Sequence, residues 1–247
     1  MAVFRWIETT RATLGRILPE AIVVMPTGAV EQHGPHLPTG TDSILSAAVC
    51  EAAAHLAAKS STRDFVLAPG VPMGASDHHL PFGGTISLKP KTLMTVLSDI
   101  MLSMHSSGAK RLVIVNGHGG NVGICHAAAA AVAAHTDLEV AQLNYWMLTE
   151  SDVGQDAAHE PTLVPGHAGQ FETSLIMAVR PELVQELPPR EAAPELPVGI
   201  GLDLHSARTW ATMDGYTDVP ATASAKRGAL WFDSIVKALS ERLLQLG

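Results

Sequence analysis

The stretch "RLVIVNGHGGNVGICHAAAAAVAAH" (residues 111–135) joins a β-branched apolar run, a glycine-rich turn and a long alanine-rich run. The first run, residues 111–117, has the length and composition of a strand buried on both faces. The alanine-rich run over residues 123–135 is typical of a helix. A strand that turns tightly into a helix is the repeating unit of α/β proteins, so this stretch predicts a parallel sheet.

The same alternation continues along the chain. Further strands are predicted at residues 21–28, 65–71 and 138–146, and helices at residues 43–58, 90–108, 172–179 and 225–246. Alternating strands and helices indicate a sheet covered on both faces, with right-handed crossovers. There is no internal repeat, low-complexity linker or sharp change of composition. We therefore predict an α/β fold: a single α-β-α sandwich domain over residues 1–247 with a mainly parallel central sheet.

Composition narrows the classes of function. The chain has 247 residues, 47% of them hydrophobic, and a net charge of −8 from 24 acidic residues against 16 Lys and Arg. This is the balance of a globular protein, and the absence of a basic run argues against a nucleic-acid partner. The sequence contains neither an apolar stretch long enough to span a membrane nor a signal peptide. Cys50 and Cys125 lie in apolar helical runs, so we expect buried thiols and a cytoplasmic location.

Unusual residues follow three of the predicted strands. The stretches are "VVMPTGAVEQHG" (23–34), "APGVPMGASDHH" (68–79) and "VIVNGHGGN" (113–121). In open α/β sheets, ligands bind beyond the carboxyl ends of the strands. We therefore expect these loops to meet at one edge of the sheet, each contributing a histidine or an acid.

The first loop, "AVEQHGPHLPTGTD" (29–42), contains potential metal ligands. In extended backbone, residues two apart point to the same side, so Glu31 and His33 could bind together. Asp42 comes directly before a helical run. The alternative is a purely structural role, with Asp42 as a helix N-cap and His33 as a hydrogen-bonding loop residue.

The turn "NGHGGN" (116–121) places His118 among glycines that let the backbone approach a ligand closely. Asn121 can brace the loop or orient a ligand through hydrogen bonds. The competing interpretation is an anion-binding turn before a helix. No Lys-Ser/Thr follows, however, and the spacing does not fit G-x-G-x-x-G.

Two further segments carry candidates. "GHAGQFETS" (166–174) contains His167, in the setting of a catalytic residue, and Glu172, which either binds a metal or favours the helix dipole. In "SDHH" (76–79), adjacent side chains normally diverge, so at most one of His78 and His79 is expected to face the site. Surface or structural roles are expected for the remaining histidines, which are His36, His55, His105, His126, His135, His159 and His205.

The predicted metal ligands are Glu31, His33, Asp42, His118 and Glu172. Histidine and carboxylate without thiolate suit Zn, Mn or Fe. This set exceeds the needs of one catalytic zinc and favours two ions roughly 3.5–4 Å apart, bridged by a carboxylate. Two such ions share a hydroxide that can attack an amide carbonyl. The sequence thus predicts a hydrolase of C–N amide bonds.

Two other classes of function remain as alternatives. One is a non-enzymatic α/β module that holds a small anion or a partner protein in its loops. The other is a serine hydrolase using Ser76, but that serine lacks the G-x-S-x-G elbow.

The chain resembles the creatininase family of metal-dependent amidohydrolases. The resemblance rests on "GAVEQHGPHLPTGTD", "HHLPFGGTISL", "NGHGGN" and "GHAGQFETSLIMAVRPELV", which occur in this order and cover about residues 21 to 180. It implies an α/β sandwich, a two-metal centre and often a hexamer. Glu31, Asp42 and His118 would hold one ion, and Asp42 would be the bridge.

The resemblance also assigns the remaining roles. His33 and Glu172 would complete the second ion's ligands. His167 would transfer a proton beside the scissile amide, with a near-neutral pKa, and Trp146 would line the substrate pocket. The other predicted substrate contacts are His79, Gly119, Gly120 and Asn121.

The sequence departs from creatininase itself, in which an acidic residue that serves the metal occupies the position of Gly120. "LVP" (163–165) also replaces a tryptophan ahead of His167. Creatinine is therefore doubtful as the substrate, although a small cyclic amide or lactam remains the leading prediction. Family members with the "NGHGGN" form, a mycofactocin-precursor peptidase and a formamide deformylase, supply the alternatives. Residues 180–220 are expected to wrap the surface, close over the site or make a subunit contact, and the sequence does not distinguish these roles.

Overall fold

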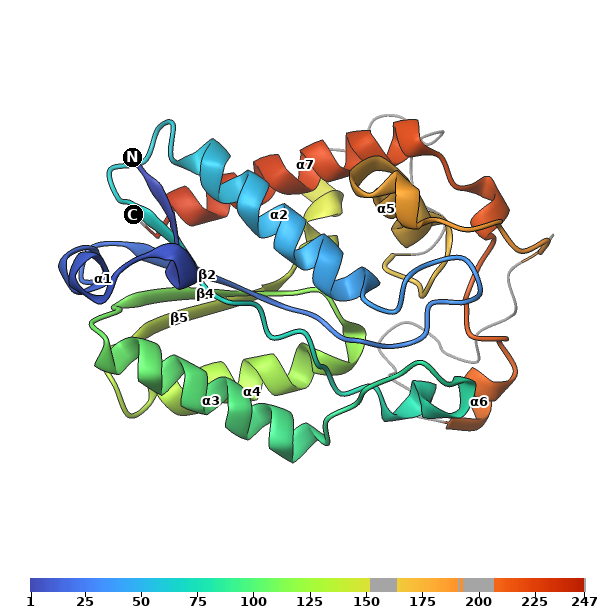
Figure 1. The fold of residues 1–247 in the computed structure, drawn as a ribbon, viewed down its shortest axis with the longest axis horizontal. Helices are drawn as coiled ribbons and strands as arrows, with labels where there is room; N and C mark the ends of the chain where they lie inside the picture. The colour runs from blue at the N-terminus through green and yellow to red at the C-terminus, as the bar shows by residue number, and fades with distance from the viewer. Residues whose placement is uncertain (152–163, 191, 193–206, 247) are drawn as a thin grey trace.

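The computed structural model describes residues 1–151, 164–190, 192 and 207–246. Its centre is a sheet of parallel strands in the order β1-β3-β2-β4-β5 (Figure 1). The strands are β1 Val3–Arg5, β2 Ile22–Thr27, β3 Phe65–Leu67, β4 Arg111–Asn116 and β5 Glu139–Asn144. The predicted parallel sheet is confirmed.

The two central strands are apolar because both of their faces are covered. Every residue of β2 is buried, and it pairs with β4 along its whole length, from Ile22 opposite Arg111 to Thr27 opposite Asn116. Pro26 has no N–H to donate. The sheet tolerates it because regular pairing with β3 has already ended, and the carbonyl of Pro26 accepts a hydrogen bond from Val71 N at 3.0 Å.

Helices cover both faces of the sheet (Figure 1). One layer contains α2 Thr41–Ala57, α5 Gln170–Val179 and α7 Ala225–Leu244; the other contains α3 Pro90–Ser106 and α4 Val122–Ala133. A separate hydrophobic cluster lies under each layer. Cys50 and Cys125 are buried free thiols in these clusters, as predicted.

All five predicted helices are present, but several short elements escaped prediction. These are β1, α1 Arg11–Ile17, α6 Ala207–Ala211 and the 3₁₀ segments η1 Trp6–Glu8, η2 Asp77–Phe82, η3 Gly119–Asn121, η4 Tyr145–Ser151, η6 Pro181–Leu183 and η7 Pro220–Thr222. The strand predicted at 65–71 ends at Leu67, before a proline, and Val71 forms only an isolated bridge to Thr27. Runs this short carry too little periodicity to identify an element.

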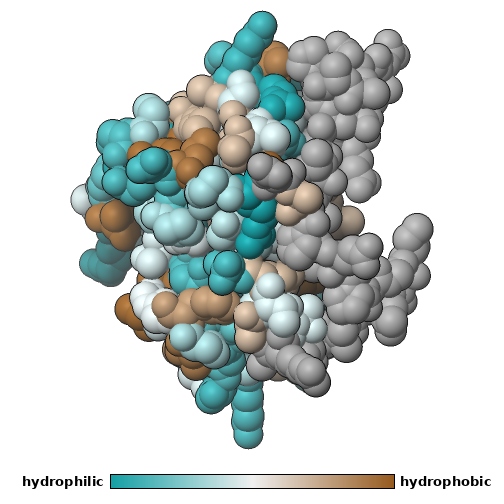
Figure 2. All heavy atoms as spheres, turned by 90° about the vertical axis from the view of Figure 1, so that its right-hand side faces the viewer, coloured by the Kyte–Doolittle hydropathy of each residue, from teal (hydrophilic) through white to brown (hydrophobic). Residues whose placement is uncertain are grey.

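The strand order brings the loops of interest together. Because all strands are parallel, the loops after β2, β3 and β4 leave from one edge, at the right of Figure 1. β3 lies on one side of β2 and β4 on the other. The loops after these strands therefore meet where the strand order reverses, which is where ligands bind in open α/β sheets. Figure 2 views this side, where apolar residues form small groups among hydrophilic ones. Among the described helices, none is both long and apolar enough to cross a membrane.

Candidate metal centre

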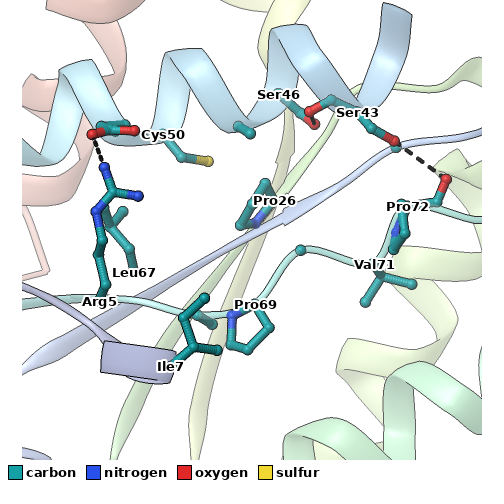
Figure 3. Close-up of a pocket in the computed structure, with 15 residues that line it drawn as sticks. Arg5, Ile7, Pro26, Ser43, Ser46, Cys50, Leu67, Pro69, Val71 and Pro72 are labelled. Carbon is teal, nitrogen blue, oxygen red and sulfur yellow. Dashed lines mark hydrogen bonds and ion pairs between the residues drawn. The ribbon is translucent and has the colours of Figure 1, made fainter. Parts of the chain in front are cut away.

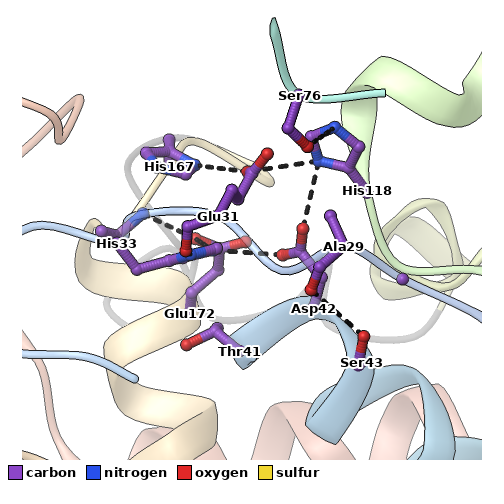
Figure 4. Close-up of polar contacts among 12 residues, drawn as sticks. Ala29, Glu31, His33, Thr41, Asp42, Ser43, Ser76, His118, His167 and Glu172 are labelled. Atoms are coloured by element: carbon purple, nitrogen blue, oxygen red, sulfur yellow. Dashed lines mark hydrogen bonds and ion pairs between the residues drawn. The ribbon is translucent and has the colours of Figure 1, made fainter. Parts of the chain in front are cut away.

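The carboxylate of Asp42 lies between His33 and His118 (Figure 4). It projects from the first turn of α2, where Gly40 takes the N-cap position. Its Oδ1 lies 3.1 Å from His33 Nε2, and its Oδ2 lies 3.1 Å from His118 Nδ1. The two oxygens of one buried carboxylate therefore face histidines from different loops. Because Gly40 is the N-cap, the alternative role of Asp42 as a cap does not apply.

Glu31 and Glu172 complete the cluster on either side of Asp42. Glu31 Oε1 is 3.2 Å from His118 Nδ1, and Glu172 Oε2 is 3.7 Å from His33 Nε2. All five predicted metal ligands are buried. Residues distant in the sequence thus meet at the strand edge, as the loop positions predicted.

The two central histidine rings are each oriented by a backbone carbonyl. His118 Nε2 lies 3.2 Å from the oxygen of Ala75, and His33 Nδ1 lies 3.1 Å from the oxygen of Glu31. A carbonyl only accepts hydrogen bonds, so these nitrogens carry protons and donate them. The opposite nitrogen of each ring faces the carboxylates. Metal-binding histidines are held in this way by a second hydrogen bond.

Several buried oxygens have no hydrogen-bond donor among the described residues. They include both carboxylate oxygens of Glu31 and Oδ2 of Asp42. Leaving such atoms unpaired is costly, and a bound cation would satisfy them. Within the described part of the chain, three groups have donor atoms that all lie within 4.8 Å of one another: Glu31, His78 and His118; Glu31, His33 and His167; and His33, Asp42 and Glu172. The donor chemistry fits a divalent ion such as Zn, Mn or Fe.

The charges at the site are strongly interdependent. Burial disfavours ionisation of Glu31, but His118, His167 and His79 outweigh it and hold its pKa well below the usual range. Burial alone would lower the pKa of His33, yet Asp42, Glu172 and Glu31 raise it to about 10. A metal cation would replace a proton in this position, since metal ligands must be deprotonated.

Glu172 has the opposite balance. Burial, together with Asp42 and Glu31, raises its pKa to about 8, although His33 and the N–H of Ala168 act in the opposite direction. Its Oε2 accepts a hydrogen bond from Ala168 N at 2.6 Å. A nearby cation would favour the ionised form.

His167 lies beside Glu31, with Nδ1 3.4 Å from Oε1, and its Nε2 is 2.8 Å from the carbonyl oxygen of Gln32. The ring is therefore held with one nitrogen toward the cluster. Without a metal ion, burial and the charges of His33 and His79 hold the pKa of His167 well below its usual range. The neutral ring must gain a proton before it can give one away.

The backbone at His167 is held in place by hydrogen bonds to Thr217, which lies in the described part of residues 180–220. His167 N donates to Thr217 Oγ1 at 2.8 Å, and Thr217 N donates to His167 O at 2.9 Å. Ala168, at φ 49°, adopts a left-handed conformation that is uncommon for a residue with a Cβ. Gly169 has no room for a side chain, because an added Cβ would lie 1.3 Å from Asp218 Oδ1. These contacts determine where His167 points.

His79 points its N–H toward the cluster, whereas His33, His118 and His167 point theirs at backbone carbonyls. Its Nδ1 lies 2.8 Å from the amide nitrogen of Gln32, whose Oε1 accepts from Gly34 N at 2.9 Å. Nδ1 therefore accepts, and Nε2 carries the proton, 3.6 Å from Glu31 Oε1. This buried N–H has no hydrogen-bond acceptor among the described residues. It is free to donate to a ligand.

Residues 8–243 match the family described as creatininase, creatinine amidohydrolase. The chain belongs to the creatininase family. The mycofactocin precursor peptide peptidase of Mycolicibacterium smegmatis is 36% identical over 90% of this chain and 84% of its own length. The creatinine amidohydrolase of Pseudomonas putida is 29% identical over 91% of this chain and 89% of its own. A solved structure described as creatininase with Mn superposes with a TM-score of 0.79 at 26% identity, over 97% of each chain. The predicted family and fold are confirmed.

Within this creatininase-family site, the prediction for "SDHH" is wrong, because both histidines face the cluster. A donor atom of His78 lies within 4.8 Å of those of Glu31 and His118, while His79 points at Glu31. The cause is η2, which begins at Asp77. In a 3₁₀ helix, successive side chains rotate by about 120°. They therefore do not alternate between opposite faces as they would in a strand.

Two residues at the site were missed by sequence reasoning. Gln32 contacts both His79 and His167. In the sequence it only separates the two predicted ligands Glu31 and His33, so it gave no signal of its own. Trp210 lies on α6, with ring centroids 4.5 Å from His79 and 5.5 Å from His167. Its only signal in the sequence is that tryptophan is scarce, with four in the chain.

The remaining predicted substrate contacts are Trp146, Gly119, Gly120 and Asn121, and they differ in burial and in the room around them. Trp146 is buried in the hydrophobic cluster under α2 and α7, with its ring centroid 5.7 Å from that of Tyr145. Gly119 is exposed with open space beside it, whereas a Cβ on Gly120 would meet Ala75 O at 2.3 Å. Asn121 ties two loops together, accepting from Ala75 N at 3.0 Å and donating to Gly28 O at 2.9 Å.

Among the other histidines, His36 is structural, since it is buried and its Nε2 lies 3.0 Å from Thr173 Oγ1. His55, His126 and His135 are exposed, as expected. His105 is half-buried and lies 3.5 Å from Asp137. The expectations for His159 and His205 fall outside the described residues.

A pocket of about 370 Å³ lies apart from the candidate metal-binding side chains, between α2 and the loop that follows β3 (Figure 3). Its lining is largely apolar, including Ile7, Pro26 and Cys50, and an ion pair joins Arg5 to Glu51. None of the predicted ligands or catalytic residues lines it. The candidate chemistry therefore belongs to the cluster at the strand edge.

Proposed function

We propose that this protein hydrolyses a C–N amide bond with two divalent metal ions. Glu31, Asp42 and His118 would hold one ion, and His33, Asp42 and Glu172 the other. The observation that carries the proposal is the position of Asp42, whose two oxygens each lie 3.1 Å from a different histidine. Placed between the two histidines, this carboxylate could serve both ions. Bound ions of this kind lower the pKa of a water and polarise a carbonyl.

The surrounding residues have distinct parts in this proposal. The Nε2–H of His79 is buried and faces the cluster, where it can donate to a substrate carbonyl or to the oxyanion that develops from it. Nδ1 of His167 can accept the proton released by the attacking water. It can then deliver that proton to the leaving nitrogen. Glu172 supports His167 indirectly, because it holds the N–H of the next residue, Ala168.

We infer that the substrate is a peptide, cleaved at an amide near one end. The peptidase of M. smegmatis, which is 36% identical, acts on a peptide. The site is also bordered by exposed apolar side chains beside His79, with Leu80 48% and Phe82 36% exposed. These exposed apolar residues could contact the side chains of a peptide substrate. A small cyclic amide has no such side chains.

A cyclic amide or lactam is the second candidate. It is favoured by the 29% identity to the creatinine amidohydrolase of P. putida over 91% of this chain. Both substrates present the same carbonyl to the ions, so they differ in what the pocket wall contacts. A formamide is a third substrate to include in any assay.

The test combines metal analysis with a substrate panel. The purified protein should contain about two equivalents of Zn, Mn or Fe per chain, and loading with each in turn would identify the active metal. Short peptides, cyclic amides and formamides would then be assayed with the loaded protein. Peptide cleavage that stops after chelation supports the proposal. A metal-free protein that binds phosphate at residues 116–121 would instead favour the non-enzymatic module.

We further propose a cytoplasmic homo-oligomer, a hexamer by resemblance, built from one domain over residues 1–247. The two buried free thiols are compatible with a reducing compartment. Light scattering of the protein in solution would measure the number of chains in the assembly.

A further inference from the structure

We propose that His78 is an additional ligand of the ion held by Glu31 and His118. The inference rests on the proposed two-metal function and adds a donor that neither the spacing of the sequence nor the resemblance assigned to the metals. It makes the histidine pair of "SDHH" a functional unit, in which His78 faces the metal and His79 the substrate.

The geometry of three side chains carries the inference. Donor atoms of His78, Glu31 and His118 all lie within 4.8 Å of one another, close enough for the three residues to hold a common ion. The rings of His78 and His118 are nearly parallel, with 7° between their planes and 5.9 Å between their centroids. His78 is half-buried, so its ring lies at the mouth of the cluster and not out in solvent.

Gly120, next to His118, has no side chain to supply a further donor. A Cβ on Gly120 would lie 2.5 Å from His118 Nε2 and 2.3 Å from the backbone oxygen of Ala75. No side chain fits at this position without displacing the histidine or the loop. The proposed ligands Glu31, Asp42 and His118 give this ion three donors, and the loop after β3 could contribute a fourth.

That loop is built to hold His78 in place. Ser87 Oγ donates to Asp77 Oδ1 at 2.7 Å and accepts from Ser76 N at 2.9 Å. Lys89 pairs with Asp77 at 2.5 Å. These bonds fix the start of η2 from which His78 projects. A preorganised imidazole of this kind is suited to binding a metal.

Trp210 packs against the same ring, with centroids 5.1 Å apart. The contact with the indole restricts the rotation of the His78 ring. The rings of Trp210 and His118 both lie close to that of His78. Both contacts keep it facing the cluster.

The test is a Co²⁺ titration of the full-length apo-protein, followed by its visible spectrum. Co²⁺ reports the number and type of its ligands through its absorption bands. His78→Ala and His78→Gln should both weaken one of two sites by more than about 10-fold, the lower limit for loss of an outer-shell partner. The bands of that site should change. His135→Ala removes an exposed histidine after α4 and should match the unmodified protein.

Thermal unfolding of each variant would show that the fold is intact. If both His78 variants bind two equivalents with unchanged affinity and spectrum, His78 is not a ligand and only this inference falls. If the unmodified protein binds no Co²⁺, the proposed two-metal function falls and the inference falls with it. The two failures are therefore distinguishable.

Discussion

Asp42 Oδ2 and His118 Nδ1 lie 3.1 Å apart, although α2 supplies one residue and the loop after β4 supplies the other. The contact is buried and joins segments that follow the two central strands, β2 and β4. Because Asp42 also faces His33 through its other oxygen, one carboxylate links the two halves of the cluster.

Asp42→Asn should remove metal from both halves. The amide keeps the shape of the side chain but loses the charge and one acceptor oxygen, so the metal content should fall from about two ions per chain to below one, with loss of activity. Elemental analysis after gel filtration measures this. Glu51→Gln changes a carboxylate on the same helix, paired with Arg5, and should retain both ions. An Asp42→Asn protein with two ions would argue against the bridge.

His167→Ala should retain both ions and lower the turnover rate by about 10²–10⁴, the usual contribution of general acid–base catalysis. The reason is that its Nδ1 points into the cluster, while the ligands of both ions come from other residues. Metal analysis and steady-state rates would be measured on the same preparation. The donor atoms of His167 also lie near those of Glu31 and His33, so a variant that loses one ion would show that His167 is a ligand instead.

Gly120→Ala should destabilise the fold by about 1–3 kcal/mol, in the range of an overpacked core, and weaken metal binding. The added methyl would collide with the backbone oxygen of Ala75 and with His118 Nε2. Gly119→Ala is the matched control, because its Cβ would meet nothing within 4 Å. Chemical denaturation and metal titration of both variants provide the comparison. Equal behaviour of the two would mean that the turn relaxes freely.

His36 should contribute to a loss of stability in acid. Burial lowers its pKa from 6.5 to about 4, so the folded protein favours the neutral ring. Its contribution is fully present above pH 6.5 and is lost as the pH falls toward 4, because the unfolded chain takes up the proton first.

His36→Gln should therefore reduce the slope of unfolding free energy against pH in this window by up to about 1.4 kcal/mol per pH unit, the value for one proton. Urea denaturation at pH values from 4.5 to 7 would measure it. His135→Gln, at an exposed position, should leave the slope unchanged. Identical slopes for His36→Gln and the unmodified protein would contradict this role.

The sequence by itself determined the parallel sheet, the main helices and the edge at which the site forms. Runs such as residues 111–117 are apolar throughout because both faces of their strands are covered. The position of Glu31, Asp42 and His118 relative to the strands then follows from chain order alone. Local composition is sufficient to predict a helix or strand when every residue of that element meets the same requirement, such as burial on both faces.

Only the tertiary structure decided which side chains meet and in which direction their protons point. His78 joins the cluster because a 3₁₀ turn replaces extended backbone, and Trp210 reaches His79 from α6, far along the chain. The carbonyls that orient His33 and His118, and the burial that lowers the pKa of His167, depend on contacts between distant segments. Such contacts leave no periodic trace in the sequence, because each arises once, from the packing of the whole fold.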